Sequence, residues 1–154
     1  MGDGRIKVAK DKAKLVKTLK SGNDTIGLFQ SYADVLIFAA SIGIEKQLRK
    51  PITEYSEEID PIRKDIFYGK GYDQTINLIA LIDNNNTILL ASDSDSEEKR
   101  IKIFEEYANA GLELLQEKIL AGSTNYTESI LLYLSNIYKV NFDNYDEFNL
   151  EDFL

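Results

Sequence analysis

The chain has 154 residues and a net charge of −8, and it contains neither cysteine nor histidine. This length suits one domain with a single hydrophobic core, which needs no disulfide or metal to hold it together. The missing residue types exclude thiolate and imidazole groups as nucleophiles or bases, and with them the usual zinc ligands. No apolar run approaches the ~18 residues of a membrane span, and the N-terminus is charged, so we expect a cytoplasmic protein.

The charge is distributed unevenly along the chain. Residues 1–20 hold seven basic and two acidic side chains, a net charge of +5, whereas the rest of the chain carries −13. We call residues 1–20 the basic head. A basic N-terminal segment on an otherwise acidic chain suggests a segment that contacts nucleic acid or docks on an acidic protein surface. A solvated helix face would explain the same lysines, and this alternative stays open. The candidate contact residues are Arg5, Lys7, Lys10, Lys14 and Lys17.

The first part of the chain predicts two helices and a loop. Apolar residues near helical spacing predict an amphipathic helix over 8–19. A second helix is predicted over 25–41, closed by Gly43 as its C-cap. Because this helix is apolar outside one narrow polar stripe, it should be central and nearly surrounded. Residues 44–61 lack a clean period and contain both prolines, which predicts a loop that leads into a short helix beginning at Pro61.

The second part of the chain predicts three further helices. A helix over 72–83 is also expected to be mostly buried. The short apolar run 88–91 is either a strand or an extended connector. The next helix is predicted over 94–120, because the spacing between its first residue and Glu97 is that of a capping box. A last helix is predicted over 126–139.

These elements predict an all-α fold, a compact single-domain bundle of five to six helices with two helices nearly fully buried. Residues 1–140 should form the helical domain, and residues 141–154 an acidic, aromatic C-terminal tail. Such a tail favours docking on a basic surface, either on a partner protein or on the chain's own first helix. The tail residues expected to make contact are Phe142, Tyr145, Phe148 and Phe153.

Three short patterns invite a chemical interpretation, and a structural one explains each better. Residues 93–98 begin like an EF-hand loop, but the required glycine and glutamate are replaced by Glu98 and Phe104, so we expect an acidic helix cap. The glycines in segment 69–71 lack the rest of a P-loop and predict a turn. Asp34 lies on a polar stripe and should be exposed or hydrogen-bonded. We therefore expect no metal, no cofactor and no catalytic residue; only a carboxylate-based, metal-dependent enzyme stays open.

One strongly predicted helix carries Asn109 and Gly111 at its middle, although glycine costs about 1 kcal/mol relative to alanine there. Ala108 and Gly111 share a face on which another helix backbone could approach closely. Glu106 lies beside that contact, and Arg63 is its predicted partner because a guanidinium binds a carboxylate in bidentate geometry. We expect this cluster to fix helix packing rather than to catalyse.

Several segments resemble, in order along the chain, the Dnd system-associated proteins, a bacterial family also called DNA phosphorothioation-associated protein 4. The segments are GLFQSYADVLIFAASIG, PIRKDIF, INLIALID and RIKIFEEYANAGLELLQE, and the similarity runs from about Arg5 to Leu120. The resemblance implies a role in anti-phage defence or in the phosphorothioation and restriction pathway, without supplying catalytic residues.

We therefore expect a small, non-enzymatic interaction subunit of a defence system linked to DNA phosphorothioation and restriction. Its partners would be protein subunits of a defence or DNA-modification complex, and a homo-oligomer stays open. The alternative is a nucleic-acid-binding module of such a system, in which the basic first helix makes weak contacts to DNA phosphates.

Overall fold

The structure, a computed structural model, describes residues 4–20 and 28–142, with side chains up to Ile137. The chain is 66% helical, and the described part holds six α-helices and one small sheet, so the predicted all-α fold is confirmed. The α-helices are α1 (Ala13–Leu19), α2 (Tyr32–Glu45), α3 (Lys64–Gly69), α4 (Asp73–Asn84), α5 (Ser94–Leu114) and α6 (Tyr126–Phe142). The short elements are strands β1 (Arg5–Ile6) and β2 (Ile62–Arg63), the 3₁₀ helices η1 (Lys10–Lys12) and η2 (Thr87–Leu90), and the π-helical turn η3 (Leu115–Ile119).

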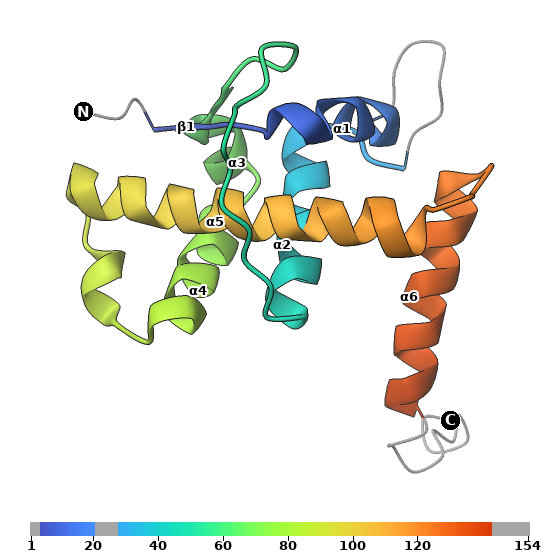
Figure 1. Ribbon diagram of the computed structural model, residues 1–154. Coiled ribbons are helices and arrows are strands. Elements are labelled where there is room, and N and C mark those ends of the chain that lie inside the picture. Colours follow the sequence, from blue (N-terminus) through green and yellow to red (C-terminus); the bar gives the residue numbers. More distant parts are fainter. Residues whose placement is uncertain (1–3, 21–27, 143–154) are drawn as a thin grey trace.

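The helix α5 runs through the middle of the molecule, and α2 crosses it (Figure 1). At the crossing, a Cβ atom added to Gly111 would lie 1.7 Å from the backbone oxygen of Ala39 in α2. Gly43 makes the reciprocal contact, since a Cβ there would lie 2.3 Å from the backbone oxygen of Tyr107. The close helix approach predicted at Gly111 is therefore present. Gly43 is not the C-cap that we predicted, because α2 continues past it to Glu45.

The hydrophobic core lies around this crossing. α2 is buried along most of its length, as predicted, and the N-terminal segment, α3 and α4 pack apolar side chains against it and α5. Phe67 of α3 meets Phe104 of α5 edge-to-face, with ring centroids 5.7 Å apart. The largest fully buried apolar side chains include Ile6, Val35, Leu36, Phe67, Ile76, Phe104, Leu112 and Ile130.

Residues 46–60 form a strap that crosses the face of α5 on the side away from α2 (Figure 1). The strap then runs beside the N-terminal segment, where the N–H of Ser56 donates to the oxygen of Val8 at 2.7 Å. β2 follows and pairs antiparallel with β1, which places Arg5 directly opposite Arg63. The predicted loop over 44–61 is thus an ordered strap that connects the N-terminal segment to α5.

Two boundaries in the first half of the chain differ from the prediction. The first helix was predicted over 8–19, but residues 8–9 are extended because the strap pairs with them, and helical backbone begins at Lys10. The second helix was predicted from residue 25. It begins at Tyr32, because the side chain of Ser31 accepts a hydrogen bond from the N–H of Asp34 and so caps the helix at that point.

Two more differences fall before α5. The apolar run 88–91 is largely the 3₁₀ helix η2 instead of a strand, and the side chain of Asn86 caps it by accepting from the N–H of Ile88 at 3.0 Å. The N-cap of α5 is Asp93, one residue before the predicted Ser94, and its carboxylate accepts from the N–H of Ser96 at 2.9 Å. An acidic helix cap is therefore confirmed at this segment. α3 is preceded by the strand β2, which the sequence did not indicate.

The helix α4 is not nearly fully buried, contrary to the prediction. Ile76, Ile79 and Ala80 are buried, whereas Leu78 and Ile82 are 55% and 56% exposed. Its inner face packs on α5, and no element within residues 4–20 and 28–142 covers its outer face. Among the described helices, none combines the length and the apolar character that a membrane crossing requires.

Candidate functional site

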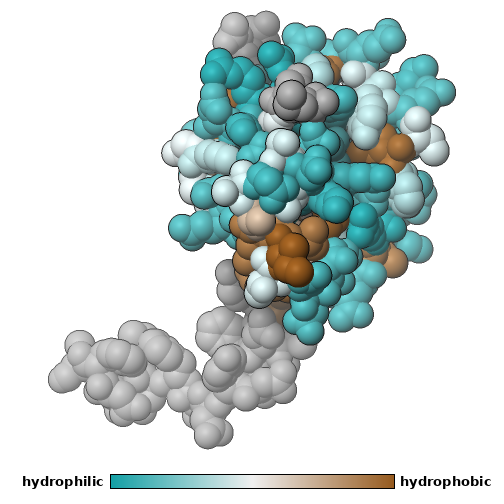
Figure 2. Space-filling view, turned by 90° about the vertical axis from the view of Figure 1, so that its left-hand side faces the viewer, coloured by the Kyte–Doolittle hydropathy of each residue, from teal (hydrophilic) through white to brown (hydrophobic). Residues whose placement is uncertain are grey.

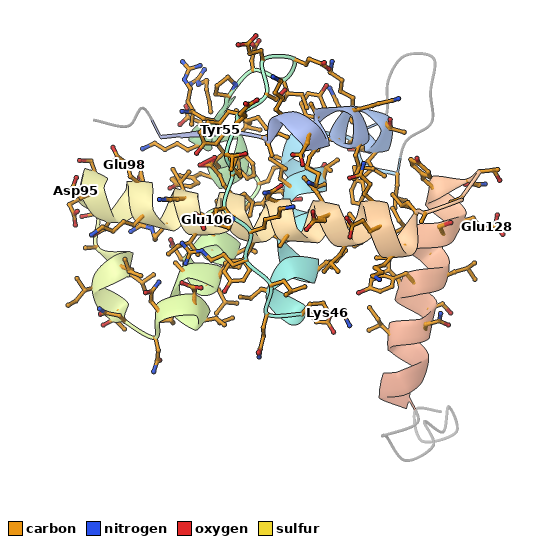
Figure 3. All side chains as sticks on the ribbon, viewed as in Figure 1. Lys46, Tyr55, Asp95, Glu98, Glu106 and Glu128 are labelled. Atoms are coloured by element: carbon orange, nitrogen blue, oxygen red, sulfur yellow. The ribbon has the colours of Figure 1, made fainter. Side chains whose placement is uncertain are left out.

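The predicted polar cluster on α5 exists, with a different cationic partner. Glu106 is only 7% exposed, and its carboxylate accepts from Nε of Arg49 at 2.7 Å. The same guanidinium donates from Nη1 to Oδ2 of Asp83 in α4 at 2.8 Å. Our prediction that Arg63 binds Glu106 was wrong, because the strap, not β2, passes this face of α5; Arg63 pairs with the exposed Asp65 instead. Figure 3 shows Glu106 on α5 beside the strap.

Asn109 holds the same strap. Its Nδ2 donates to the backbone oxygens of Lys50 at 3.2 Å and Pro51 at 3.4 Å, and the N–H of Lys50 donates to the backbone oxygen of Glu106 at 3.1 Å. The ammonium of Lys50 also pairs with Glu113, one further turn along α5. These contacts support the structural interpretation of the cluster, since each fixes the strap on α5. Oδ1 of Asn109 is buried without a hydrogen-bond partner.

Two phenol–carboxylate contacts lie at opposite ends of α4. Tyr107 donates its hydroxyl to Oδ1 of Asp83 at 2.6 Å, and burial together with this hydrogen bond raises the pKa of Tyr107 to about 12. Tyr72 donates to Oδ1 of Asp34 at 2.6 Å, and Lys70 donates to the same carboxylate at 3.1 Å. Burial alone would raise the pKa of Asp34, but these hydrogen bonds lower it below its ordinary value. Asp34 is thus hydrogen-bonded, as expected.

Glu105 is a buried carboxyl group that the sequence did not single out. It is 8% exposed, and its Oε2 accepts from the backbone N–H of Lys7 at 3.2 Å. Burial raises its pKa to about 7, against the opposing effect of the Lys7 N–H. In the described ranges, no three carboxylate, imidazole or thiolate side chains lie close enough together to hold a metal ion. The signal that could have identified Glu105 is its place between Phe104 and Ala108 on an otherwise apolar helix face.

The basic head contacts the strap of its own chain. Nζ of Lys10 lies 3.1 Å from Glu54, and Nζ of Lys17 lies 2.9 Å from Glu58. Nζ of Lys7 lies 4.9 Å from the ring centroid of Tyr55, which Figure 3 places beside the N-terminal segment. Three of the five predicted contact cations therefore have partners on the strap. The other two, Arg5 and Lys14, are exposed.

Lys12 in this head has an unexpected position. It is 1% exposed, and its Nζ pairs with the exposed carboxylate of Asp11 at 2.9 Å. This hydrogen bond lowers the pKa of Asp11 below its ordinary value. Nothing in the local sequence pattern distinguishes Lys12 from Lys10 or Lys14, so its burial was not predictable.

Among the described residues, exposed large apolar side chains are most numerous on the neighbouring elements α4 and η2. Four side chains there are exposed: Leu78 (55%), Ile82 (56%), Ile88 (73%) and Leu90 (39%). We call this area the α4–η2 surface. Figure 2 shows apolar side chains gathered low on the face to which η2 belongs. Apolar patches with a polar rim commonly mark sites of protein–protein contact.

The segment that carries the α4–η2 surface is rich in acidic residues, although two of them, Asp83 and Glu97, are paired with Arg49 and Lys64. The segment 71–98, which forms α4, η2 and the start of α5, contains six acidic residues and no lysine or arginine. Asp95 and Glu98 lie at the N-terminal end of α5 (Figure 3). This surface was not predicted, because the apolar residues of α4 favour burial by their spacing.

A second, smaller apolar area lies on α6, where Leu131 and Leu132 are 55% and 59% exposed. The predicted contact residues of the tail, Phe142, Tyr145, Phe148 and Phe153, fall outside the described residues, apart from the backbone of Phe142. The docking of the tail stays a prediction.

Comparison with known proteins places the chain in a family. No curated protein and no solved structure matches it. A family model does match, over residues 5–153, and its description is DNA sulphur modification system-associated protein 4. The match includes the α2–α5 crossing, the strap and the α4–η2 surface, and it extends past the region of resemblance into the C-terminal tail. The chain therefore belongs to the family of DNA sulphur modification system-associated protein 4.

Proposed function

We propose that the protein is a non-enzymatic accessory subunit that binds another protein of a DNA sulphur modification system through the α4–η2 surface. The system would serve anti-phage defence through modification and linked restriction of DNA. The observation that carries this proposal is the exposure of four large apolar side chains on α4 and η2, in a segment of the chain without a single cation.

The composition of the surface indicates the kind of partner. Burial of Leu78, Ile82 and Ile88 would provide the apolar centre that stable protein interfaces have. The acidic side chains around it would attract a basic surface and disfavour an acidic one. The partner expected here is a protein that presents an apolar side chain or ridge surrounded by lysines or arginines.

A symmetric dimer through this surface is disfavoured by the same charges. Two copies facing each other would bring together two segments without basic residues, each with four acidic residues besides Asp83 and Glu97, which are paired with Arg49 and Lys64. Like charges opposed across an interface cost binding energy, so this face should bind a different protein chain.

The alternative function, contact of the basic first helix with nucleic acid, has less support. Lys10 and Lys17 already pair with Glu54 and Glu58 of the strap, so a DNA phosphate would have to compete with these carboxylates. We expect DNA contacts of the head to be weak and to disappear as salt rises.

The test compares two double variants of matched exposure. Leu78→Gln with Ile82→Gln changes the α4–η2 surface, and Leu131→Gln with Leu132→Gln changes a pair of almost equal exposure on α6. Each variant is co-expressed with the proteins of the sulphur modification system, and the affinity of the protein that co-purifies with the wild type is then measured by calorimetry.

We expect the α4 variant to bind that protein at least about tenfold more weakly, because two central apolar contacts are lost. The α6 variant should bind within about twofold of the wild type. Unchanged binding of the α4 variant, or an equal loss in the α6 variant, would contradict the proposal.

A further inference from the structure

A groove with a volume of about 490 Å³ lies beside the small sheet, away from the α4–η2 surface. Three cations from three different segments line it: Arg5 of β1, Arg63 of β2 and Lys20, which follows α1. Only Arg5 belongs to the basic residues that the sequence singled out for nucleic-acid contact. The groove was not predictable, because the three cations are up to 58 positions apart in the sequence.

The two arginines lie directly opposite each other in the small sheet. Arg5 and Arg63 are direct cross-strand partners in the antiparallel pair, and like charges in this position destabilise a sheet. Arg63 is exposed and pairs with Asp65, only two residues away in its own segment. Both arginines line the groove, and a guanidinium group suits the geometry of a phosphate.

The start of α2 adds further favourable features to the groove. Ser31, Tyr32 and Ala33 line it, and α2 is fourteen residues long. The hydroxyl of Ser31 accepts from the N–H of Asp34, so the first N–H groups of the helix, on Tyr32 and Ala33, have no acceptor within α2. Nζ of Lys20 lies 4.5 Å from the ring centroid of Tyr32, which holds this cation at the groove. The positive end of a helix, two arginines and a lysine together favour phosphate binding.

The groove also has two acidic residues on its strap wall, Glu58 and Asp60. Glu58 is paired with Lys17, which neutralises much of its charge. Carboxylates at one wall would repel a bare inorganic anion, whereas they accept hydrogen bonds from the hydroxyl and amino groups of a sugar or base. A ligand with both a phosphate and hydrogen-bond donors fits this distribution, and the volume of the groove lies in the range of small-ligand sites.

We propose that this groove binds one nucleotide, with its phosphate at Arg5, Arg63, Lys20 and the first turn of α2. The nucleotide is either free or part of a single-stranded nucleic acid, since both present the same chemistry. The site is independent of the proposed protein interface, because it lies on different elements and involves none of the residues of the α4–η2 surface.

The test measures binding at low salt to a deoxynucleoside 5′-monophosphate, to a single-stranded DNA of about eight nucleotides and to inorganic phosphate. The variant Lys20→Gln with Arg63→Gln removes two cations of the groove. The matched control, Lys10→Gln with Lys14→Gln, removes two cations of the exposed basic head outside it.

We expect the groove variant to bind the nucleotide probes at least about tenfold more weakly than wild type, and the control variant to stay within about twofold. Inorganic phosphate should bind more weakly than either nucleotide probe. Similar affinity for the mononucleotide and the oligonucleotide would identify a free nucleotide as the ligand, and tighter binding of the oligonucleotide would identify a strand.

Equal weakening in both variants would show diffuse charge attraction and overturn the site. So would the absence of saturable binding by either nucleotide probe. The double variant on α4, Leu78→Gln with Ile82→Gln, should leave nucleotide binding unchanged, so failure of this proposal can be distinguished from failure of the proposed protein interface.

Discussion

The helices α2 and α4 both pack against α5, but they differ in how much of their surface is buried. α2 crosses α5 so closely that only glycine fits at two points of contact, and the N-terminal segment covers much of the rest of it. α4 buries only its inner face, and Leu78 and Ile82 stay more than half exposed. An apolar helix therefore needs a cover, but the cover need not come from the same chain. In α4 we attribute the missing cover to a partner protein.

The enclosed region around the α2–α5 crossing and the open region of α4 and η2 meet at Arg49. Its guanidinium binds Glu106 of α5 and Asp83 of α4, and Asp83 also accepts from the hydroxyl of Tyr107. Toward α2, apolar side chains pack in the core, and the backbones of α2 and α5 approach each other closely at Gly43 and Gly111. Toward η2, large apolar side chains are exposed, and the buried Arg100 of α5 donates to the backbone oxygens of Leu89 and Ala91. Substitutions on either side should therefore differ in their effect on the free energy of unfolding.

The largest effect is expected at the α2–α5 crossing. Gly111→Leu should destabilise the fold by more than about 3 kcal/mol, because the new Cβ would overlap the backbone of Ala39, which cannot move as a side chain can. Gly111→Ala should also destabilise, although helix propensity alone would give a gain of about 1 kcal/mol. Urea denaturation followed by circular dichroism measures both.

The control for this substitution is Gly69→Ala. Gly69 is the last residue of α3, and a Cβ there would meet no atom within 4 Å. Its stability should be unchanged or slightly raised. If Gly111→Ala were as well tolerated as Gly69→Ala, the helices would not be in close contact at residue 111.

The difference in burial between α2 and α4 can be tested by replacing one leucine with alanine in each helix. Leu36 of α2 is 1% exposed and Leu78 of α4 is 55% exposed. Leu36→Ala should cost about 3 kcal/mol of stability because it leaves a cavity in the core. Leu78→Ala should cost less than about 1 kcal/mol, since half of the side chain is already in water. Similar losses in the two variants would mean that α4 is covered within the chain.

Local features were predictable from the sequence, and long-range ones were only partly so. Periodicity and capping residues located α4 and α6 to within a few residues and α5 at its start, whereas the helix predicted to reach residue 120 ends at Leu114 and continues as the π-helical turn η3. The strands β1 and β2 have two residues each, too few for an alternating pattern, and they pair across more than fifty residues of sequence. Residues 8–9 look helical by spacing, but the strap pairs with their backbone and keeps them extended.

The candidate site shows the same limit. Gly111 indicated a close contact, because glycine in a strong helix needs a reason, but its partner Ala39 could not be named. Glu106 was expected to bind Arg63, but it binds Arg49. Which arginine it binds depends on the path of the strap, which no local pattern fixes. The absence of cations from 71–98 was the one signal available for the α4–η2 surface.

On the enclosed side of α5, Glu105 should make stability depend on pH. Its carboxyl packs against the segment of Lys7, next to Glu106 and near Lys102, and burial raises its pKa from 4.5 to about 7. Below about pH 4.5 the group is protonated in both the folded and the unfolded state, so its burial carries no ionisation cost. As the pH rises from about 4.5 to 7, the unfolded state ionises first and stability falls, by up to about 3 kcal/mol.

The variant Glu105→Gln isolates this effect. Glutamine can still accept from the N–H of Lys7, but it does not ionise. The difference in unfolding free energy between variant and wild type should favour the variant above pH 7 and shrink toward pH 4.5. A difference that stays constant with pH would show that Glu105 ionises normally in the folded protein.

A smaller loss than in the core variants is expected at Arg49, which joins α4 to α5. Arg49→Met keeps much of the side-chain length but removes the cation between Glu106 and Asp83, and it leaves the carboxylate of Glu106 buried without its charged partner. Because Arg49 itself is about one third exposed, water can replace part of the lost contact, and we expect a loss of about 2 kcal/mol.

The matched control is Arg63→Met, whose partner Asp65 is well exposed, and it should cost no more than about 1 kcal/mol. Urea denaturation of both variants gives the comparison directly. If Arg63→Met were the more damaging of the two, the strap would not be the element that joins α4 to α5, and the division between the enclosed and the open region would have to be drawn elsewhere.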